Sequence, residues 1–355
     1  MLTSLRLQDF RCFTSLAFEV PPAGVILVGN NAQGKTSILE ALCVLIRLHS
    51  PRCHRMSPMD RIGKSAFGIA GDPWQMERRV EHSSVGLILK VDQELRQTHA
   101  EYVSDGGLLV WMGNEDLDLI RGPGEGRRKF LDFLGSQINP GYRTAWSRYR
   151  RALRAKNLLL KNPQTTDTEI NSYDEILITE GTYLTESRKV MVGEMAPLAA
   201  RAQRFISGQD ELLTLTYRPG GGTNFRAALA EARTREVRMR QALVGPHRDE
   251  LILRIDGNLA TDYASEGQQR TIALALKLAQ GEMLHLHSGK PPLYLLDDIF
   301  GELDPERRNA LMNFLPPLAQ KWITTTHLDW LNDSPLLTDA SRLSIARGQV
   351  LKWRE

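Results

Sequence analysis

The stretch "VILVGNNAQGKTSILEAL", residues 25–42, decides the fold class of this chain. Residues 25–28 are apolar and predict a short buried strand, and from Lys35 onward the apolar residues recur at helical spacing. Between them Gly29 and Gly34 permit a sharp turn with inward-pointing N–H groups, because glycine has no Cβ that clashes. Phosphates bind at such a helix N-terminus, so the stretch predicts a nucleoside triphosphate site.

The residue types of this loop suit separate tasks in nucleotide binding. Lys35 can reach the β- and γ-phosphate oxygens, and the Thr36 hydroxyl can be a ligand of Mg²⁺. We therefore expect ATP and Mg²⁺ as cofactors, with contacts from Gly29, Asn30, Asn31, Gly34, Lys35, Thr36 and Ser37. The alternative is a chance match in a glycine-containing loop. Chance matches that also have a strand before them and a helix after them are rarer.

The composition is that of an ordinary globular protein. The chain has 355 residues, 42% hydrophobic and 25% charged, which is enough for one large core or two smaller ones. Its net charge is only +3, so any surface for nucleic acid must be local. Its three cysteines form no Cys-x-x-Cys pair, and neither an apolar leader nor an 18-residue apolar window is present. We expect a cytoplasmic protein with reduced thiols and no membrane span.

Hydrophobic patterning changes along the chain and predicts two lobes. Short runs predict strands, in a largely antiparallel sheet, at residues 4–10, 16–20, 66–71, 75–82, 85–92, 99–103 and 108–112. Long helical patterns follow, at residues 126–138, after Pro140, and at 168–205 and 224–243. Strands then return with a hairpin turn at Asp256-Gly257. We expect residues 1–120 and 244–355 to form lobe I, and 121–243 to form an inserted, mainly helical lobe II.

An acidic pair ends a later apolar strand. In "PLYLLDD" the strand 293–296 is followed by Asp297 and Asp298. Beside a phosphate loop, the first carboxylate can hold Mg²⁺ indirectly and the second can act as the base for a water molecule. The alternative is a strand that simply runs into an acidic turn.

Three further motifs flank this strand. "SEGQQR", 265–270, opens a helix and offers Ser265, Gly267 and Gln268 as a second anion-binding site, although a plain helix cap would also explain it. Asp304 precedes a helix that starts with Pro305, as an ordinary N-cap does. A last strand ends at His327, and a lone histidine is more often an ordinary surface or core residue.

The order of these motifs resembles that of the ABC-type ATPases. Phosphate loop, Ser-x-Gly-Gln, apolar strand with an acidic pair, Leu-Asp, and strand with His follow one another. The resemblance implies an α/β head with a mixed sheet. It also implies that two heads enclose two ATP molecules, each held by one subunit's phosphate loop and the other's signature serine and glycine. Asp304 and His327 would then also lie near the nucleotide.

Spacing and local strings resemble the RecF family in particular. The segment between Thr36 and Ser265 is too long for a transporter head, and its prolines and "RPGGGT" exclude the continuous coiled coil of an SMC-type protein. The resembling strings include "LRLQDFRCF" at 5–13, "GPGEGRRKFLDFLGSQINPGY" at 122–142, "VGPHRDEL" at 244–251 and "LLDDIFGELDPERR" at 295–308. Arg11, in the first string, becomes a further candidate for nucleotide binding.

This resemblance implies a function in DNA metabolism. It implies an ATP-dependent DNA-binding dimer whose slow ATPase serves as a switch. RecR and RecO would be its partners in placing RecA on gapped DNA, at junctions of single and double strands. The setting would be replication, recombination and the SOS response at the nucleoid.

The signature departs from the family pattern at one position. Glu266 stands where the family commonly has a basic residue, which reverses a charge near the partner's nucleotide. The glutamine of the family's Q-loop is not placed, and neither Gln75 nor Gln137 is assigned to it.

A local basic run is the candidate DNA surface. Residues 142–161 contain seven cations and no acid. Seven cations could neutralise several phosphates, although a solvated helix face paired with carboxylates from elsewhere would look the same. The DNA-binding candidates are Arg143, Arg148, Arg150, Arg151, Arg154 and Lys156.

Other functions use fewer of these motifs. A P-loop kinase would need the phosphate loop but leave Ser265, Asp304 and His327 without a task. A transporter subunit would not need the basic helical insert. An SMC-like head would need the coiled coil that is missing.

Overall fold

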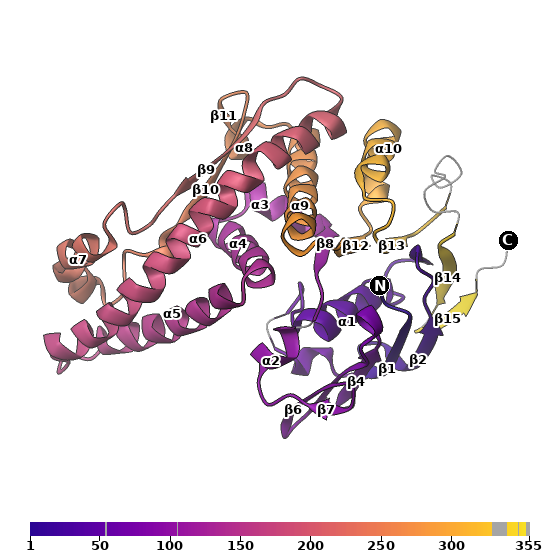
Figure 1. Ribbon diagram of the computed structural model, residues 1–355, viewed down its shortest axis with the longest axis horizontal. Helices are drawn as coiled ribbons and strands as arrows, with labels where there is room; N and C mark the ends of the chain where they lie inside the picture. Colours follow the sequence, from indigo (N-terminus) through magenta and orange to yellow (C-terminus); the bar gives the residue numbers. More distant parts are fainter. Residues whose placement is uncertain (54, 105, 329–338, 347, 353–355) are drawn as a thin grey trace. The chain divides into compact units, whose positions relative to one another are not determined.

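The computed structural model describes residues 1–53, 55–104, 106–328, 339–346 and 348–352 (Figure 1). The chain divides into two compact units, one of residues 1–115 and 284–355 and the other of residues 116–283. These units differ from the predicted lobes in residues 116–120 and 244–283, which pack with the helical unit. For residues 244–283 the reason is that a strand in this segment pairs along its whole length with a strand of the helical middle.

The first unit contains the parallel sheet that the phosphate loop requires. Its strands lie in the order β15-β14-β3-β13-β12-β8, and every pair is parallel except β14 with β15. The strands are β3 (Gly24–Val28), β8 (Leu109–Gly113), β12 (Leu293–Asp297), β13 (Lys321–Thr325), β14 (Ser341–Ala346) and β15 (Gln349–Lys352). The four strands β3, β8, β12 and β13 are fully buried or nearly so, as strands covered on both faces must be.

A second, antiparallel sheet completes the strands of this unit. Its order is β2-β1-β4-β5-β6-β7. The strands are β1 (Ser4–Phe10), β2 (Phe13–Glu19), β4 (Phe67–Gly71), β5 (Arg78–Ser83), β6 (Gly86–Val91) and β7 (Glu94–Leu95). The alternation of apolar and polar residues predicts the first five of these strands, because each has one buried face.

The helices of this unit include one that corrects a prediction. They are α1 (Lys35–Arg47), α2 (His99–Ser104), α10 (Pro305–Phe314) and the short turns η1 (Ser57–Met59), η2 (Pro73–Gln75), η3 (Asn114–Leu117) and η5 (Phe300–Glu302). The strand predicted at residues 99–103 is instead α2, in which the adjacent Tyr102 and Val103 are both buried, whereas a strand with one exposed face would bury only one of them. The prediction of β8 in the antiparallel sheet is also wrong, since it pairs in parallel with β12.

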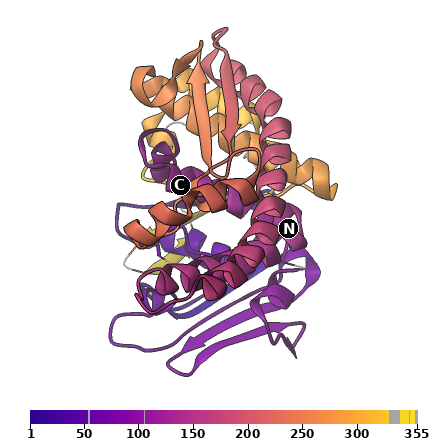
Figure 2. The ribbon, with the colours of Figure 1, turned by 90° about the vertical axis from the view of Figure 1, so that its left-hand side faces the viewer.

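The second unit is mainly helical. Its helices are α3 (Asp118–Arg121), α4 (Gly124–Ile138), α5 (Pro140–Leu159), α6 (Asp167–Ser207), α7 (Phe225–Met239), η4 (Pro246–Arg248), α8 (Ala260–Tyr263) and most of α9 (Glu266–Ser288). α5 packs along α6, which continues through Pro197 (Figure 1). A small sheet joins them, made of β9 (Leu213–Arg218), β10 (Glu250–Ile255) and β11 (Asn258–Leu259) (Figure 2).

The hairpin of this sheet follows from local chemistry, but β9 itself does not. Asp256 and Gly257 have φ angles of 49° and 80°, as the two central residues of a type I′ hairpin turn require, so the predicted turn is confirmed. β9, which the sequence patterns do not predict, pairs with β10 over six residues.

A buried polar cluster holds the helices of this unit together. The Arg188 guanidinium on α6 lies 2.7 Å from Asp132 Oδ1 on α4 and 2.6 Å from Asp249 Oδ2 ahead of β10. Its Nε donates to the Tyr142 hydroxyl on α5, at 2.9 Å. A buried arginine is tolerated because two carboxylates and a hydroxyl satisfy it.

His247 beside this cluster should make the protein sensitive to acid. Its Nε2 lies 3.2 Å from the Ala242 carbonyl and must donate, so Nδ1 accepts from the Tyr149 hydroxyl at 2.7 Å. Burial lowers the pKa of His247 from 6.5 to about 4. The unfolded chain therefore binds more protons between these values, and stability declines as the pH drops through this window. We expect this one group to cost about 2 kcal/mol of unfolding free energy between pH 7 and pH 5.

Urea unfolding at both pH values checks this expectation. His247→Gln should lose about 2 kcal/mol of the pH dependence. His285→Gln, at an exposed position on α9, serves as the control and should keep the wild-type dependence. Equal pH dependence in wild type and His247→Gln would contradict it.

Candidate functional site

The phosphate loop lies at the carboxyl edge of the parallel sheet. Gly34 is the N-cap of α1 with a φ angle of 111°, and no described side chain caps this helix end. A Cβ at Gly34 would lie 2.6 Å from Cys12 Sγ and 2.8 Å from Phe13 Cζ, so no other residue fits without a shift. The first N–H groups of α1 are thus available to an anion, and the helix dipole favours negative charge there.

Lys35 and Thr36 begin α1 and face different partners. Lys35 Nζ donates to the Gly29 and Asn30 carbonyls, at 2.6 and 3.0 Å, which folds the lysine back over the loop. Thr36 Oγ1 donates to Asp297 Oδ1 at 2.9 Å. A hydroxyl next to a carboxylate is the oxygen donor set that Mg²⁺ prefers, so these two residues fit the predicted metal role.

The acidic pair is brought to the loop by strand register. In the parallel sheet, β12 lies next to β13, and β13 lies next to β3, so their carboxyl ends meet at one edge. This is the edge at which open α/β sheets bind ligands. Asp298 directly follows β12 in the left-handed region, with a φ angle of 54°, which aspartate tolerates better than most residues.

Thr324 positions both carboxylates, and sequence reasoning missed it. Its Oγ1 donates to Asp297 Oδ1 at 2.8 Å and accepts from the Asp298 N–H at 2.8 Å. The three consecutive threonines at the end of β13 are the signal that could have found it, because an apolar strand that ends in hydroxyls has polar neighbours to satisfy.

Burial, more than the neighbouring charges, shifts the pKa values of the ionisable groups at this edge. Burial lowers the pKa of Lys35, although Asp298 and Asp297 oppose this. Burial also raises the pKa of Asp297, against the hydrogen bonds from Thr324 and Thr36. For Asp298 burial raises the pKa as well, and Lys35 opposes it. A carboxyl with raised proton affinity is a better base than an ordinary aspartate.

His327 and Asp304 have local partners of their own. His327 is exposed just beyond β13, with Nδ1 3.0 Å from Thr326 Oγ1, and it is among the charges that act on Asp298. Asp304 caps α10, since Oδ1 accepts from the Arg307 N–H at 2.9 Å. Direct hydrogen bonds to Asp304 lower its pKa, first of all that N–H. The predicted catalytic role of His327 and the predicted nucleotide contact of Asp304 stay predictions.

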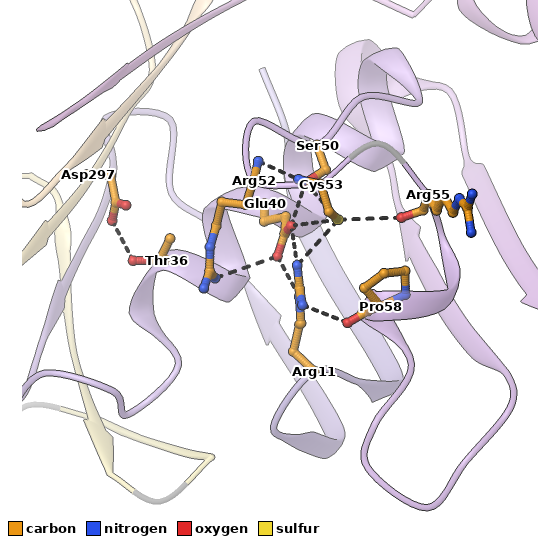
Figure 3. A network of polar contacts seen from close by, with 9 residues as sticks. All are labelled: Arg11, Thr36, Glu40, Ser50, Arg52, Cys53, Arg55, Pro58 and Asp297. Atoms are coloured by element: carbon orange, nitrogen blue, oxygen red, sulfur yellow. Dashed lines mark hydrogen bonds and ion pairs between the residues drawn. The ribbon is translucent and has the colours of Figure 1, made fainter. Parts of the chain in front are cut away.

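Arg11 lies in the polar network that surrounds the middle of α1 (Figure 3). Its Nε and Nη2 donate to the two oxygens of the buried Glu40, at 2.8 and 2.7 Å, and its Nη1 donates to the Pro58 carbonyl at 2.6 Å. Ser50 also donates to Glu40, at 2.6 Å. Arg11 thereby ties the β1–β2 turn to α1, and its predicted contact with the nucleotide stays a prediction.

The predicted signature forms the N-terminus of α9 in the second unit. Ser265 and Gln268 exchange hydrogen bonds as a capping box, with Gln268 N–H to Ser265 Oγ at 3.2 Å and Ser265 N–H to Gln268 Oε1 at 2.8 Å. Gln268 Nε2 also donates to Glu211 at 2.9 Å. Gly267 lies in the first turn of α9. The cap leaves the Ser265 hydroxyl proton available as a donor.

The basic run forms α5 and separates into two faces. Tyr142, Ala145, Tyr149 and Ala152 are buried, whereas the cations at i, i+7, i+8 and i+11 lie on the opposite face: Arg143, Arg150, Arg151 and Arg154. Arg150 stacks on Trp146, with its guanidinium carbon 4.7 Å from the ring centroid. None of Arg150, Arg151 and Arg154 forms an ion pair with a residue that the structure describes. Arg148 lies 3.3 Å from Glu180.

Lys156 has to be removed from the predicted DNA surface. Its side chain is fully buried, with Nζ 2.8 Å from Asp174 Oδ1 on α6 and 2.6 Å from Glu236 Oε2 on α7. It lies on the same helical face as Tyr149 and Ala152, which packs against the neighbouring helices. An acid-free run on one helix therefore does not make all of its cations surface residues.

Comparisons with known proteins agree on one family. An AAA domain model matches residues 4–183. The DNA replication and repair protein RecF of Gloeobacter violaceus is 35% identical over 371 residues, covering 98% of both chains. That of Synechococcus sp. strain JA-3-3Ab is 36% identical over 372 residues, with 98% of this chain and 97% of that protein covered.

Solved structures point the same way. The recombination mediator protein RecF of the RecFOR pathway, solved with ATP, matches with a TM-score of 0.90 at 26% identity, covering 99% of this chain and 97% of that one. The Smc head domain of Pyrococcus furiosus matches with a TM-score of 0.57 at 15% identity over 99% of this chain and 96% of that one, a likeness of fold alone. Among the described residues, no helix combines the length and apolar character that a membrane crossing needs.

Proposed function

The chain belongs to the RecF family of DNA replication and repair proteins, and from that premise we propose that it is an ATP-dependent DNA-binding protein that dimerises on ATP. The observation that carries the proposal is the contact of Thr36 with Asp297 beside the uncapped start of α1. Phosphate loop and acidic pair thus meet at one sheet edge although 261 positions separate the two residues.

Each residue at this edge has a chemical task in the proposal. The first N–H groups of α1 and Lys35 bind the β- and γ-phosphates, and Lys35 must exchange its carbonyl partners for phosphate oxygens. Thr36 and, indirectly, Asp297 would hold Mg²⁺, which would neutralise phosphate charge. Asp298 accepts the proton of the attacking water, and its raised pKa suits that role. ATP hydrolysis is slow and acts as a switch.

Dimerisation follows from the position of the signature. Ser265 and Gly267 lie at the N-terminus of α9. The hydroxyl proton of Ser265 and the backbone N–H groups of the first turn can donate to a phosphate, as the first N–H groups of α1 can. In the proposed dimer they bind the nucleotide held by the partner's phosphate loop. ATP then joins two heads, and hydrolysis separates them.

Four cations on one face of α5, exposed except for the half-buried Arg143, form the proposed DNA surface. Arg143, Arg150, Arg151 and Arg154 share one helical face, and the last three lack ion-pair partners among the described residues. Two copies of this face, joined by nucleotide, neutralise about twice as many phosphates as one copy. Phosphate contacts carry no base information, so binding is largely indifferent to sequence. Partners of the RecR and RecO type would use this complex to place RecA on gapped DNA, in the cytoplasm at the nucleoid.

Alternative functions leave parts of this arrangement unused. A P-loop kinase has no use for the capped signature on α9 or for the basic face of α5. An SMC-like head shares the fold, but α5 and α6 form a short antiparallel pair rather than a long coiled coil. Phosphate transfer to an added small molecule, rather than to water, would favour the kinase.

A charge reversal on α5 tests the proposal. Arg150→Glu combined with Arg151→Glu should weaken binding to duplex DNA by more than about tenfold, because each dimer then neutralises about four fewer phosphates. The slope of log affinity against log salt should become shallower by about 0.9 for each phosphate that is no longer neutralised. Fluorescence anisotropy with labelled duplex, over a salt series with and without ATP, measures both quantities.

The control is Arg201→Glu combined with Arg204→Glu, near the C-terminal end of α6, which changes the net charge equally. It should leave the salt slope nearly unchanged. If the α5 variant also keeps the wild-type affinity and slope, α5 is a solvated face and DNA binds elsewhere.

A further inference from the structure

The first turn of α9 carries a charged network that the proposed function does not use. Glu266, next to Ser265, lies 3.1 Å from Arg270 Nη2 and 3.7 Å from Arg121 Nη2. Arg121 ends α3, so it reaches Glu266 from a segment 145 positions away in the sequence. Both cations of the network therefore converge on one carboxylate at the predicted signature.

Buried contacts orient this network. Gln269 is nearly buried, donates through Nε2 to the Ala264 carbonyl at 2.8 Å, and accepts from Arg121 Nε. Thr261 on α8 donates to the Ile120 carbonyl at 3.0 Å, which joins α8 to α3. The contacts among α3, α8 and the start of α9 thus fix the position of Arg121 next to Glu266.

The Glu266 carboxylate is more exposed to solvent than either of the two arginines that pair with it. The Glu266 side chain is 65% exposed and that of Arg121 is 45% exposed, whereas Arg270 is 22% exposed. The carboxylate is thus the most exposed charge of this network, on the residue next to Ser265. An anion that approaches Ser265 is therefore repelled by an exposed negative charge on the adjacent residue.

We propose that Glu266 is a brake on ATP-driven dimerisation. The inference rests on the proposed function, in which the partner's triphosphate approaches Ser265. Glu266 repels that triphosphate and holds Arg121, which would otherwise attract it. Removal of the carboxylate raises the charge of the three-residue network from +1 to +2. A symmetric dimer contains two such interfaces, so the change in the free energy of dimerisation is about twice the change at one interface.

Glu266→Gln tests the proposal. The amide keeps the size of the side chain and removes only its charge, and the position is exposed, so the variant should fold. We expect its dimer, formed with a non-hydrolysable ATP analogue and Mg²⁺, to be about tenfold tighter than the wild-type dimer in low salt. The gain should shrink below about twofold in about 0.5 M salt, because exposed charges are then screened. Sedimentation velocity over a protein concentration series gives both dimer affinities.

Matched variants separate this effect from a general change of charge. Glu282→Gln removes a carboxylate of the same helix that pairs with Arg201, away from the signature, and should dimerise like wild type. Arg121→Gln should weaken the dimer. Ser265→Arg should abolish it while each subunit still binds the analogue, because a bulky cation replaces the hydroxyl.

The outcomes distinguish two failures. If wild type dimerises with the analogue and Glu266→Gln is no tighter, the brake is wrong and the proposed dimer stands. If wild type stays monomeric at every concentration, the proposed function fails, and this inference fails with it. A gain in Glu282→Gln equal to that in Glu266→Gln would show a general charge effect and would also overturn the brake.

Discussion

The Lys35→Ala chain is expected to lose ATP binding by more than about a hundredfold while it remains folded. In the free protein Lys35 Nζ donates to the Gly29 and Asn30 carbonyls, so the ammonium is held at the loop and can exchange these partners for phosphate oxygens. A charge-assisted hydrogen bond in a partly buried site is about twice as strong as a neutral one. Equilibrium binding of a fluorescent ATP analogue measures the loss.

Lys321→Ala is the matched control for this experiment. Lys321 is a buried lysine at the start of β13 that also donates to carbonyls, those of Pro316 and Ala319, at 2.8 and 2.9 Å. It lies at the opposite end of the strand from the nucleotide edge. Its loss should lower stability but not affinity for ATP. If Lys35→Ala binds the analogue as wild type does, the assignment of the phosphate loop is wrong.

The Asp298→Asn chain is expected to bind ATP normally and to hydrolyse it more than about a hundredfold more slowly. Asparagine tolerates the left-handed backbone at this position, so the turn after β12 should persist. Its carbonyl can orient a water molecule but is a poor acceptor for the proton. The ATP-bound dimer should therefore accumulate in this variant. Phosphate release measured against ATP binding separates the two effects.

The Asp297→Asn variant distinguishes the proposed roles of the two carboxylates. Asp297 contacts Thr36, so its loss should raise the Mg²⁺ concentration needed for nucleotide binding, whereas Asp298→Asn should leave it unchanged. In wild type, burial raises the pKa of Asp298, so hydrolysis should decline on the acid side at a higher pH than an ordinary aspartate would give. Wild-type turnover in Asp298→Asn would exclude Asp298 as the base.

Local physical chemistry was enough to predict much of the site. Gly34 has to be glycine because a Cβ would collide with Cys12 and Phe13, and the hairpin at Asp256-Gly257 has to turn because both residues accept positive φ angles. The acidic pair after a buried strand, the caps at Ser265 and Asp304 and the amphipathic strands follow from short-range rules as well. Each of these depends on neighbours within a few positions, which the sequence displays directly.

Only the tertiary structure decided which distant residues meet. Thr324 supports both carboxylates, and Arg121 contacts Glu266, through pairings of strands and helices that no local pattern specifies. α2 forms a helix rather than a strand, and it buries both of the adjacent residues Tyr102 and Val103, which a strand with one exposed face would not do. On α5 the cations are alike in sequence, yet Lys156 is buried against Asp174 and Glu236 while Arg151 faces solvent. The sequence determines which residues carry a charge. Whether a charged side chain is solvated, forms an ion pair or is free to bind DNA depends on which parts of the fold pack against it.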